Sequence, residues 1–237
     1  MTFGGIKIFI QNKCLVNYCK NNALSTFDQN GNLTEDKSYC LEHIPDPGLI
    51  KKQIYNYIAN NDKIVGLNAC GMNFLDINLS NKQFFGCNFS HCTFTNIHSD
   101  NTTLKMCIFD YTVFYDCNLI NNHSLFTSYS QCTFTHTLFT SSDMIQSNFN
   151  CIKAYQSSFD NSDLYNSRFI KATLVDTSFR NCNLKKCNFI DSKRVNVSFK
   201  MSNTREAVFY TLGSGLETGM DPNNQALSNS DYSGGAL

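Results

Sequence analysis

Three cysteines and one histidine near the start of the chain have the spacing of a metal site. Cys14 and Cys19 are separated by four residues, and Cys40 and His43 follow as a Cys-x2-His pair after twenty more residues. Thiolate and imidazole ligands paired in this way on either side of a loop are typical of a closed tetrahedral zinc site. The segment is polar and too short to bury a core, so a bound zinc ion would explain its order. The alternative is that these thiols only pack, because cysteine is frequent throughout the chain.

A cluster of cations near the C-terminal end is the second candidate site. Arg180 and Lys200 are twenty residues apart, as are Lys185 and Arg205, and Lys186 is adjacent. If one turn of the chain takes twenty residues, these five cations surround one corner and form a binding patch for an anionic surface. We favour a protein over nucleic acid as the partner, because no aromatic side chains for base stacking are interleaved with the cations. Solvated charge without a partner is the alternative.

The chain has no net charge, but its charge is unevenly distributed. Nineteen Lys and Arg balance nineteen Asp and Glu over 237 residues. This balance argues against a nucleic-acid packaging protein that binds chiefly through global electrostatics. Residues 74–163 contain seven acids and three bases (net −4), whereas residues 164–210 contain three acids and nine bases (net +6). We therefore expect one acidic and one basic half.

The other polar residues form no pattern typical of catalysis. His91, His98, His123 and His136 are not spaced so that any two of them would stack at a twenty-residue interval. The sequence contains no glycine-rich phosphate loop and no nucleophile elbow, and its carboxylates are scattered. We predict that the protein is not an enzyme.

A five-residue repeat dominates the sequence. From Phe74 to Phe209 there are twenty-eight positions at intervals of five, here called centres, and twenty-four of them are Phe, Leu, Met, Tyr or Ala. Two residues before each centre, twenty-two of twenty-eight residues are Ala, Cys, Ser, Thr or Val. A period of five fits neither a helix nor a flat strand. It predicts a chain that turns a corner every five residues, with one large and one small side chain pointing inward.

The number of sides in each coil can be tested by stacking the centres. With four sides, centres twenty residues apart form columns, and one column is wholly aromatic: Phe89, Phe109, Tyr129, Phe149, Phe169, Phe189 and Phe209. Three sides give only mixed columns. We therefore expect four sides and about seven coils of parallel strands, roughly 34 Å long at about 4.8 Å per coil.

Stretches such as Ser162-Asp163-Leu164 and Cys187-Asn188-Phe189 resemble the pentapeptide-repeat proteins, whose unit is Ala-Asp/Asn-Leu-x-x. The resemblance covers about residues 74–209. It implies an all-β solenoid, a right-handed quadrilateral parallel β-helix, and says little about function because such solenoids serve varied binding roles. In some relatives the C-terminal ends pair, so the resemblance also implies a homodimer through that end as an alternative to self-capping. The segment from Tyr39 to His43 looks like the second half of a zinc knuckle.

Four centres depart from the pattern: Ser99, Ser124, Arg194 and Thr204. Ile97 two positions earlier compensates for the small Ser99. A buried unpaired guanidinium is costly, so we expect a bulge at Arg194 that turns Val195 inward. A similar slip is expected at Ser124.

The ends of the solenoid need covers. Asp46 and Pro47 are an N-cap and a first helical residue, and Leu49, Ile50, Ile54, Tyr57 and Ile58 lie on one helical face. We assign a small Cys/His segment to residues 1–45, a capping helix and linker to 46–62, and the β-helix to 63–210. A flexible C-terminal tail follows at 211–237. Leu212, Leu216 and Met220 could fold over the last coil.

The leading hypothesis is a non-enzymatic protein-binding or scaffolding solenoid. The alternatives are a topoisomerase (DNA gyrase) modulator that mimics DNA, and a secreted bacterial effector that docks on host components. The sequence has no membrane span and no secretory signal, so we expect a cytoplasmic protein.

Overall fold

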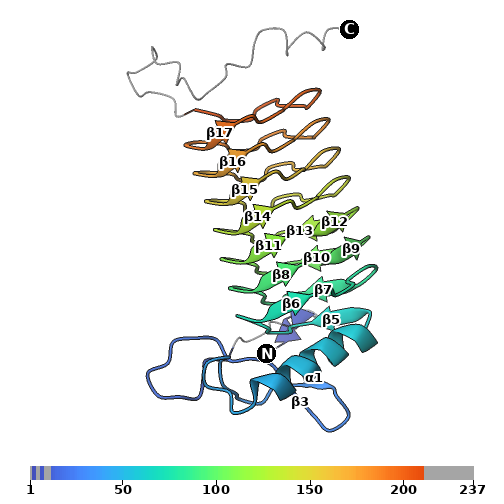
Figure 1. Cartoon of the computed structure of the whole chain (residues 1–237), viewed down its shortest axis with the longest axis vertical. Helices are drawn as coiled ribbons and strands as arrows, with labels where there is room; N and C mark the ends of the chain where they lie inside the picture. Colours follow the sequence, from blue (N-terminus) through green and yellow to red (C-terminus); the bar gives the residue numbers. More distant parts are fainter. Residues whose placement is uncertain (1, 4–5, 8–11, 211–237) are drawn as a thin grey trace.

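A computed structural model describes residues 2–3, 6–7 and 12–210, and residues 63–210 form a stack of coils (Figure 1). Seven parallel strands form one side along the whole stack. They are β6 (Asn73–Leu75), β8 (Thr93–Thr95), β11 (Val113–Tyr115), β14 (Thr133–Thr135), β15 (Lys153–Tyr155), β16 (Thr173–Val175) and β17 (Lys193–Val195). The predicted all-β solenoid of about seven coils is confirmed.

The other sides contain shorter parallel ladders, which isolated bridges continue. One side consists of β5 (Lys63–Val65), β7 (Gln83–Phe85), β10 (Thr103–Lys105) and β13 (His123–Leu125), and another of β9 (His98–Asp100) and β12 (Asn118–Ile120). The fourth side has only bridges, such as Asn88 with Ile108. Two antiparallel pairs precede the solenoid: β1 (Thr2–Phe3) with β2 (Ile6–Lys7), and β3 (Thr26–Phe27) with β4 (Leu33–Thr34).

Each coil takes twenty residues and has four sides. In every parallel pair of coils the register joins a residue to the one twenty positions later, as in Phe94 with Phe114. The aromatic column forms as expected: the rings of Phe149 and Phe169 are 4.8 Å apart between centroids, and so are those of Phe169 and Phe189. The centres therefore share one continuous hydrophobic core.

The small inward residues form hydrogen bonds as well as fitting the narrow interior. Thr112 Oγ1 donates to the carbonyl oxygen of Phe89 in the coil below at 2.7 Å, and Ser167 Oγ donates to that of Met144 at 2.7 Å. Cys187 Sγ donates to the carbonyl oxygen of Leu164 at 2.9 Å. The sequence prediction considered only side-chain size. Size therefore explains only part of the preference for Cys, Ser and Thr two residues before each centre.

Every corner requires a residue with positive φ. Two residues after each centre, from Gly66 to Glu206, the backbone is in the left-handed region, with φ between 47° and 80°. None of these twenty-nine residues is Val, Ile or Thr, which are the residues most strained there. Asn, Asp or Gly supply fifteen of the corners, because their short or absent side chains tolerate this conformation.

The expected distortions at Arg194 and Ser124 are wrong. Arg194 keeps the regular register opposite Leu174, and Val195 is 44 % exposed. The guanidinium instead lies 5.1 Å from the centroid of the Phe209 ring, and this cation–π contact offsets part of the cost of burial. Ser124 is also in register, and its hydroxyl lies 3.0 Å from that of Tyr129.

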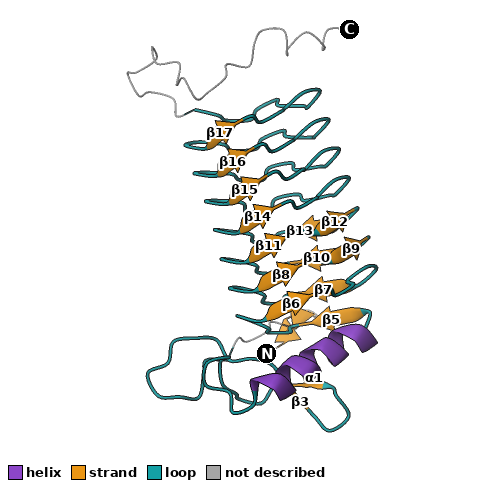
Figure 2. Ribbon diagram, viewed as in Figure 1, coloured by secondary structure: helices purple, strands orange, loops and turns teal. Residues whose placement is uncertain are grey.

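The helix α1 (Pro47–Asn60) lies across the N-terminal end of the stack (Figure 2). Asp46 caps it by accepting a hydrogen bond from the Leu49 amide at 2.9 Å, as predicted. Ile50, Ile54 and Ile58 are buried against the first coil, whereas Leu49 is exposed. The buried face is therefore narrower than expected. The tail at 211–237, with Leu212, Leu216 and Met220, lies outside the described residues.

Candidate metal centre and basic patch

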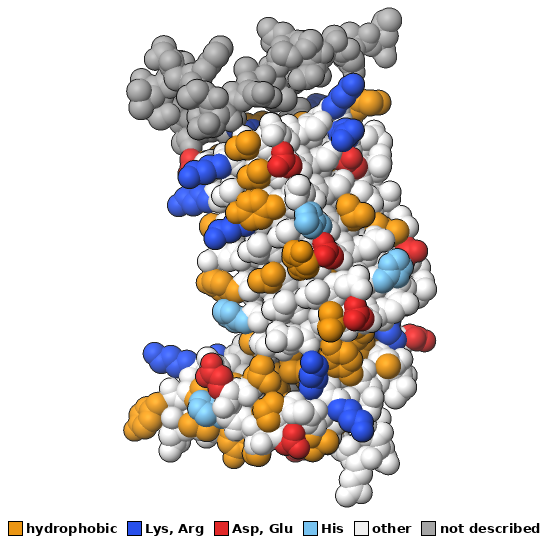
Figure 3. Space-filling model, in the orientation of Figure 1, with side chains coloured by type: hydrophobic (Ala, Val, Ile, Leu, Met, Phe, Trp, Pro, Cys, Tyr) orange, Lys and Arg blue, Asp and Glu red, His pale blue; other side chains and the backbone are white. Residues whose placement is uncertain are grey.

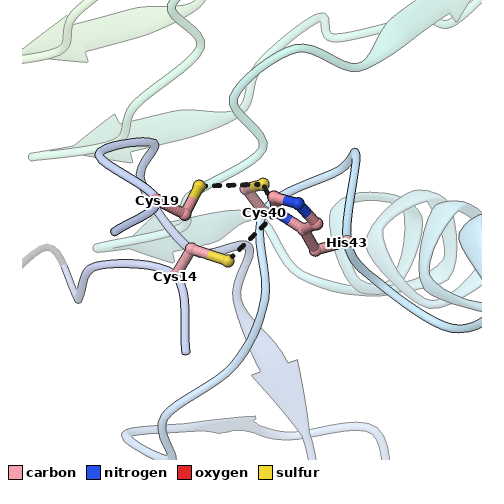
Figure 4. Close-up of side chains that lie close together, drawn as sticks. All are labelled: Cys14, Cys19, Cys40 and His43. Carbon is pink, nitrogen blue, oxygen red and sulfur yellow. Dashed lines mark hydrogen bonds between the residues drawn. The ribbon is translucent and has the colours of Figure 1, made fainter. Parts of the chain in front are cut away.

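The four predicted ligands lie together. The Sγ atoms of Cys14, Cys19 and Cys40 and a ring nitrogen of His43 are all within 4.8 Å of one another (Figure 4). His43 Nδ1 lies 3.2 Å from Cys40 Sγ and 3.6 Å from Cys14 Sγ, and the Sγ atoms of Cys19 and Cys40 are 3.9 Å apart.

Three of the six separations between these atoms are close to the edges of a zinc tetrahedron, whereas a pair at the 4.8 Å limit would have to approach by about 1 Å on binding the ion. Zn–S and Zn–N bonds of about 2.3 and 2.0–2.1 Å give edges of about 3.8 Å between two sulfurs and about 3.6 Å between sulfur and nitrogen. The three measured distances differ from these edges by at most a few tenths of an ångström. The residues present therefore fit a four-coordinate metal with three thiolate ligands and one imidazole.

Two short backbone motifs position the ligands. Cys14 and Cys19 lie in a loop closed by antiparallel pairing of Lys13 with Asn22, and the Cys19 amide donates to the carbonyl of Val16 at 3.1 Å. Cys40 and His43 lie in one hydrogen-bonded turn, in which the His43 amide donates to the Cys40 carbonyl at 3.0 Å. Each motif brings two ligands to the same side of the backbone.

The thiols differ in their electrostatic surroundings. Desolvation opposes ionisation of Cys14, but hydrogen bonds from the backbone amides of Cys40 and Val16, together with the His43 and Cys40 side chains, lower its pKa to about 6. The Asn21 amide acts to lower the pKa of Cys19, yet desolvation and the neighbouring Cys14 and Cys40 sulfurs outweigh it and raise that pKa. One thiolate is thus favoured before the others, as expected when several ionisable sulfurs share a site.

The Cys/His segment is anchored to the first coil (63–82). The Ser25 amide donates to the Asn68 carbonyl at 3.0 Å, and the Asn68 amide donates to Ser25 Oγ at 2.8 Å. The buried Asn68 side chain donates to the carbonyl of Ala23, and Leu24 is part of the solenoid core. The Cys/His cluster is therefore connected to the covered end of the solenoid.

A cleft of about 530 Å³ lies between this segment and the first coils. Charged and planar side chains line it, including Lys13, Lys20, Glu42, Asp110 and Tyr111. Sequence reasoning missed this cleft, since its two walls come from segments far apart in the chain.

The thiols inside the solenoid are not a reactive site. Burial raises the pKa of Cys117 to about 11 and those of Cys182 and Cys187 to about 12. Because the thiolate is the reactive form, these cysteines act as small donors in the core.

The predicted basic patch is divided between two successive corners. Asn181, next to Arg180, donates its amide to the Lys200 carbonyl, which places Arg180 and Lys200 together on adjacent coils. The Lys186 amide donates to the Arg205 carbonyl, which places Lys185, Lys186 and Arg205 at the next corner. These five cations therefore occupy two corners, five residues apart along each coil, rather than the single corner expected.

Two carboxylates partly neutralise the patch. Glu206 lies 3.6–3.8 Å from Lys185, Lys186 and Arg205, and Asp160 lies 3.8 Å from Arg180. Five cations against two carboxylates leave a net charge of +3. Among the described residues no ion pair involves Lys200, so its charge adds to the surplus.

This geometry defines the class of the protein: a parallel β-solenoid with four five-residue sides, closed at its N-terminal end by a helix and a Cys/His segment. Residues 132–209 match the family model described as "Pentapeptide repeat region". These residues of the solenoid are therefore a pentapeptide-repeat region.

Several solved structures are similar to it. A trypsin-treated variant of QnrB1, a plasmid-mediated fluoroquinolone resistance protein, matches with 16% identity and a TM-score of 0.41 over 63% of this chain and 78% of that one. HetL, a protein involved in heterocyst differentiation regulation from the cyanobacterium Nostoc sp. strain PCC 7120, matches with 10% identity and a TM-score of 0.28, over 66% and 93%. Rfr23 from the cyanobacterium Cyanothece 51142 matches with 12% identity and a TM-score of 0.27, over 60% and 90%. No curated protein matches the chain.

Over the described ranges, no helix has the length and apolar character needed to cross a membrane.

Proposed function

We propose that this chain is a non-enzymatic, protein-binding scaffold whose basic end docks on an acidic surface of a partner protein. The observation that carries this proposal is the net charge of +3 in the two-corner patch formed by Arg180, Lys185, Lys186, Lys200 and Arg205. These side chains extend from a backbone whose coils are hydrogen-bonded to one another, so their points of attachment are fixed before a partner arrives and only the side chains lose entropy on binding. A cationic surface of this kind accelerates encounter with an acidic partner.

The patch is tested by charge reversal. The wild-type protein and a Lys185→Glu, Arg205→Glu variant are isolated from the native cell, and co-purifying proteins are compared by mass spectrometry. The proposal expects an acidic partner that the wild type retains and the variant loses. Lys153→Glu, at a base of the same solenoid outside the patch, is the matched control and should retain it. A partner set unaffected by the double reversal would contradict the proposal.

We also propose that Cys14, Cys19, Cys40 and His43 hold a structural zinc ion. The tetrahedral edges described above and the three-sulfur, one-nitrogen donor set support zinc over hard cations, which prefer oxygen ligands. With all four positions taken by protein atoms, the ion would order the segment rather than bind a substrate. Protein purified without added metal should contain one equivalent of zinc by elemental analysis. A Cys40→Ser, His43→Ala variant should contain none, and wild-type protein without metal would refute the idea.

DNA mimicry, the basis of the gyrase-modulator alternative, has weaker support. Such mimicry needs carboxylates repeated along one face. Asp143 and Asp163 are neighbours on adjacent coils, but His123 and Asn183 occupy the next positions of the same column. Two successive carboxylates do not reproduce the phosphate spacing of a duplex, so we do not propose this function. The effector alternative, docking on host components, and a cytoplasmic location both stay sequence-based predictions.

A further inference from the structure

The interior of the solenoid contains a cavity beside two centres that are serines. Ser99 pairs with Leu119 in the next coil, and Ser124 pairs with Leu104 in the coil below. Each serine thus occupies a position that a leucine fills in the neighbouring coil, and both serines are buried. The space that remains has a volume of about 30 Å³. Side chains of adjacent coils cover this part of the solenoid on the face shown in Figure 3.

Five polar side chains line this cavity, whereas the rest of its wall consists of aromatic and aliphatic groups. They are Ser99, Thr102, Asn122, Ser124 and Tyr129, and none of them is more than 5 % exposed. A buried polar group that lacks a hydrogen-bond partner is costly. The hydrogen-bond donors of all five side chains therefore have to be matched with acceptors.

Three of the five side chains form an ordered chain of hydrogen bonds. Asn122 Nδ2 donates to Ser99 Oγ at 3.1 Å, and Ser99 Oγ donates to Thr102 Oγ1 at 2.8 Å. Thr102 Oγ1 in turn donates to the Leu79 carbonyl at 2.7 Å. The side-chain amide of an asparagine has two N–H donors. Within the described ranges, the second N–H of Asn122 has no acceptor.

The other two polar side chains form a pair of hydroxyls. Ser124 Oγ lies 3.0 Å from the Tyr129 hydroxyl oxygen. Burial raises the pKa of Tyr129, so both hydroxyls keep their protons. One hydroxyl of the pair donates to the other, and the proton of the second has no acceptor in the part of the chain that the structure describes. The cavity is therefore bordered by two buried donors that need an acceptor.

We propose that the cavity binds one ordered water molecule, which accepts hydrogen bonds from Asn122 Nδ2 and from the Ser124–Tyr129 hydroxyl pair. A buried water needs a cavity of at least about 10–15 Å³ and two to four polar partners, and this site provides both. The two lone pairs of the water match the two remaining donors. Its own protons can be accepted by the hydroxyl oxygens that line the cavity, since each of these has two lone pairs.

The chemistry of the site favours water over an apolar occupant. A small apolar molecule in the same space would leave the Asn122 N–H and the hydroxyl proton unpaired, which is costly in the interior. A bound water would also join two coils, because Asn122 already donates to Ser99 of the coil below. This site depends on neither the Cys/His cluster nor the basic patch.

A crystal structure at high resolution tests the site directly. We expect density for a water at about 2.7–3.2 Å from Asn122 Nδ2 and from one hydroxyl oxygen of the Ser124–Tyr129 pair. Magnetic relaxation dispersion of water oxygen-17 should detect a long-lived internal water in solution, because the surrounding coils have to open before it can leave. A cavity without density, or with density that contacts only carbon atoms, would overturn the proposal.

A double substitution tests the same site in solution. Ser124→Leu with Tyr129→Phe removes both hydroxyls and introduces the residue types of Leu104 and Phe109 in the same columns. This variant should contain one long-lived water fewer than the wild type. Thr177→Val is the matched control, because it removes a buried hydroxyl more than two coils away, and it should leave the number of such waters unchanged. An equal number in the double variant and the wild type would show that the water does not bind at this site.

The crystal structure and the relaxation measurement on the wild type need no variant, so they decide the question even if the double substitution prevents folding.

Discussion

Stacked aromatic side chains fill the interior of the solenoid, and each ring contacts rings of the coils above and below. Phe169 is fully buried and lies 4.8 Å from both Phe149 and Phe189 between centroids. It also forms edge contacts with Phe159 and Phe179. Removing such a ring leaves a cavity that neighbouring coils cannot close, because their hydrogen bonds fix the distance between them.

Phe169→Ala should therefore lower the free energy of unfolding by about 3–5 kcal/mol. Urea-induced unfolding followed by circular dichroism measures the change. Phe126→Ala is the matched control, because Phe126 is 55 % exposed at a corner, and it should change stability by no more than about 0.5 kcal/mol. Equal losses in the two variants would contradict the assignment of one inward and one outward ring.

The corners impose a different requirement, which concerns the backbone rather than packing. Asn166 has φ 57°, a conformation that costs an ordinary L-residue about 1–2 kcal/mol and a β-branched one more. Asn166→Val should thus destabilise the protein by about 1–2 kcal/mol, while Asn166→Gly should change stability by less than about 0.5 kcal/mol. Thermal unfolding of the two variants measures the change in stability that each substitution causes. A valine that is tolerated as well as glycine would show that the corner does not need positive φ.

His136 links three coils through its side chain. Its Nε2 lies 2.6 Å from Gln156 Oε1 and its Nδ1 3.0 Å from Asp116 Oδ1. Both partners accept hydrogen bonds, so the imidazolium form, with two donors, is favoured and the pKa of His136 is raised. Because this folded-state pKa exceeds the ordinary value, the resulting stabilisation is complete below about pH 6.5 and is lost as the pH rises through the folded pKa.

Asp116→Asn removes one charged acceptor and should lower the pKa of His136 toward its ordinary value. An NMR titration of the imidazole measures it, with His98 as an internal reference on another side of the solenoid. A pKa for His136 that does not change in the variant would show that Gln156 alone sets it.

At the scale of elements, the Cys/His segment and α1 act as a joint cover for the N-terminal end. Ser25 pairs with Asn68 of the first coil, and Ile54 and Ile58 of α1 are buried beside the same coil. A metal that orders the segment would therefore protect the edge of the first coil, which otherwise exposes unpaired strand groups.

Removal of metal with a chelator should increase amide hydrogen exchange in residues 64–72 and leave residues 143–162 in the fifth coil unchanged. Hydrogen exchange with mass spectrometry resolves the two regions. The Cys40→Ser, His43→Ala variant should show the same local increase without chelator. An increase of similar size along the whole solenoid would instead mean that the metal affects global stability. No change in exchange would show that the metal does not help to protect the first coil.

The sequence predicted the elements whose signal is periodic or local. The five-residue period predicted the coils and their register, and the Asp46-Pro47 pair predicted the start of α1. The clustering of the three cysteines with His43 was also predictable, since two short spacings need only one long-range contact to bring the four side chains together. Arg194 was predicted wrongly because the rings of Phe209 and Tyr210, which lie near its guanidinium, belong to the next coil. The left-handed corners carry a sequence signal, the lack of β-branched residues, which becomes recognisable once the corner position is known.

At the scale of the whole molecule, the solenoid is a repeated unit in which each coil contacts only its neighbours. Deleting residues 143–162 removes one complete coil and brings Ser142 next to Asp163, with every column preserved. We expect this shortened protein to fold and to unfold cooperatively, with a lower midpoint.

Deleting residues 143–160 removes two residues fewer yet shifts the later centres out of phase. This control should lose the cooperative transition, which circular dichroism during heating would detect. If both deletions behave alike, the twenty-residue register does not determine the fold.

The left-handed corners also affect which mutations the gene can accept. A single nucleotide change converts an Asn codon into one for Thr or Ile, and either residue would strain a corner. The same codon reaches Asp, Ser, His, Lys or Tyr by other single changes, and all five occupy corners in this chain. Selection at these sites should therefore act mainly on the second codon base and remove changes that introduce Thr or Ile. The identity of the exposed corner residue can otherwise vary. The solenoid can thus acquire new surfaces over generations without losing its shape.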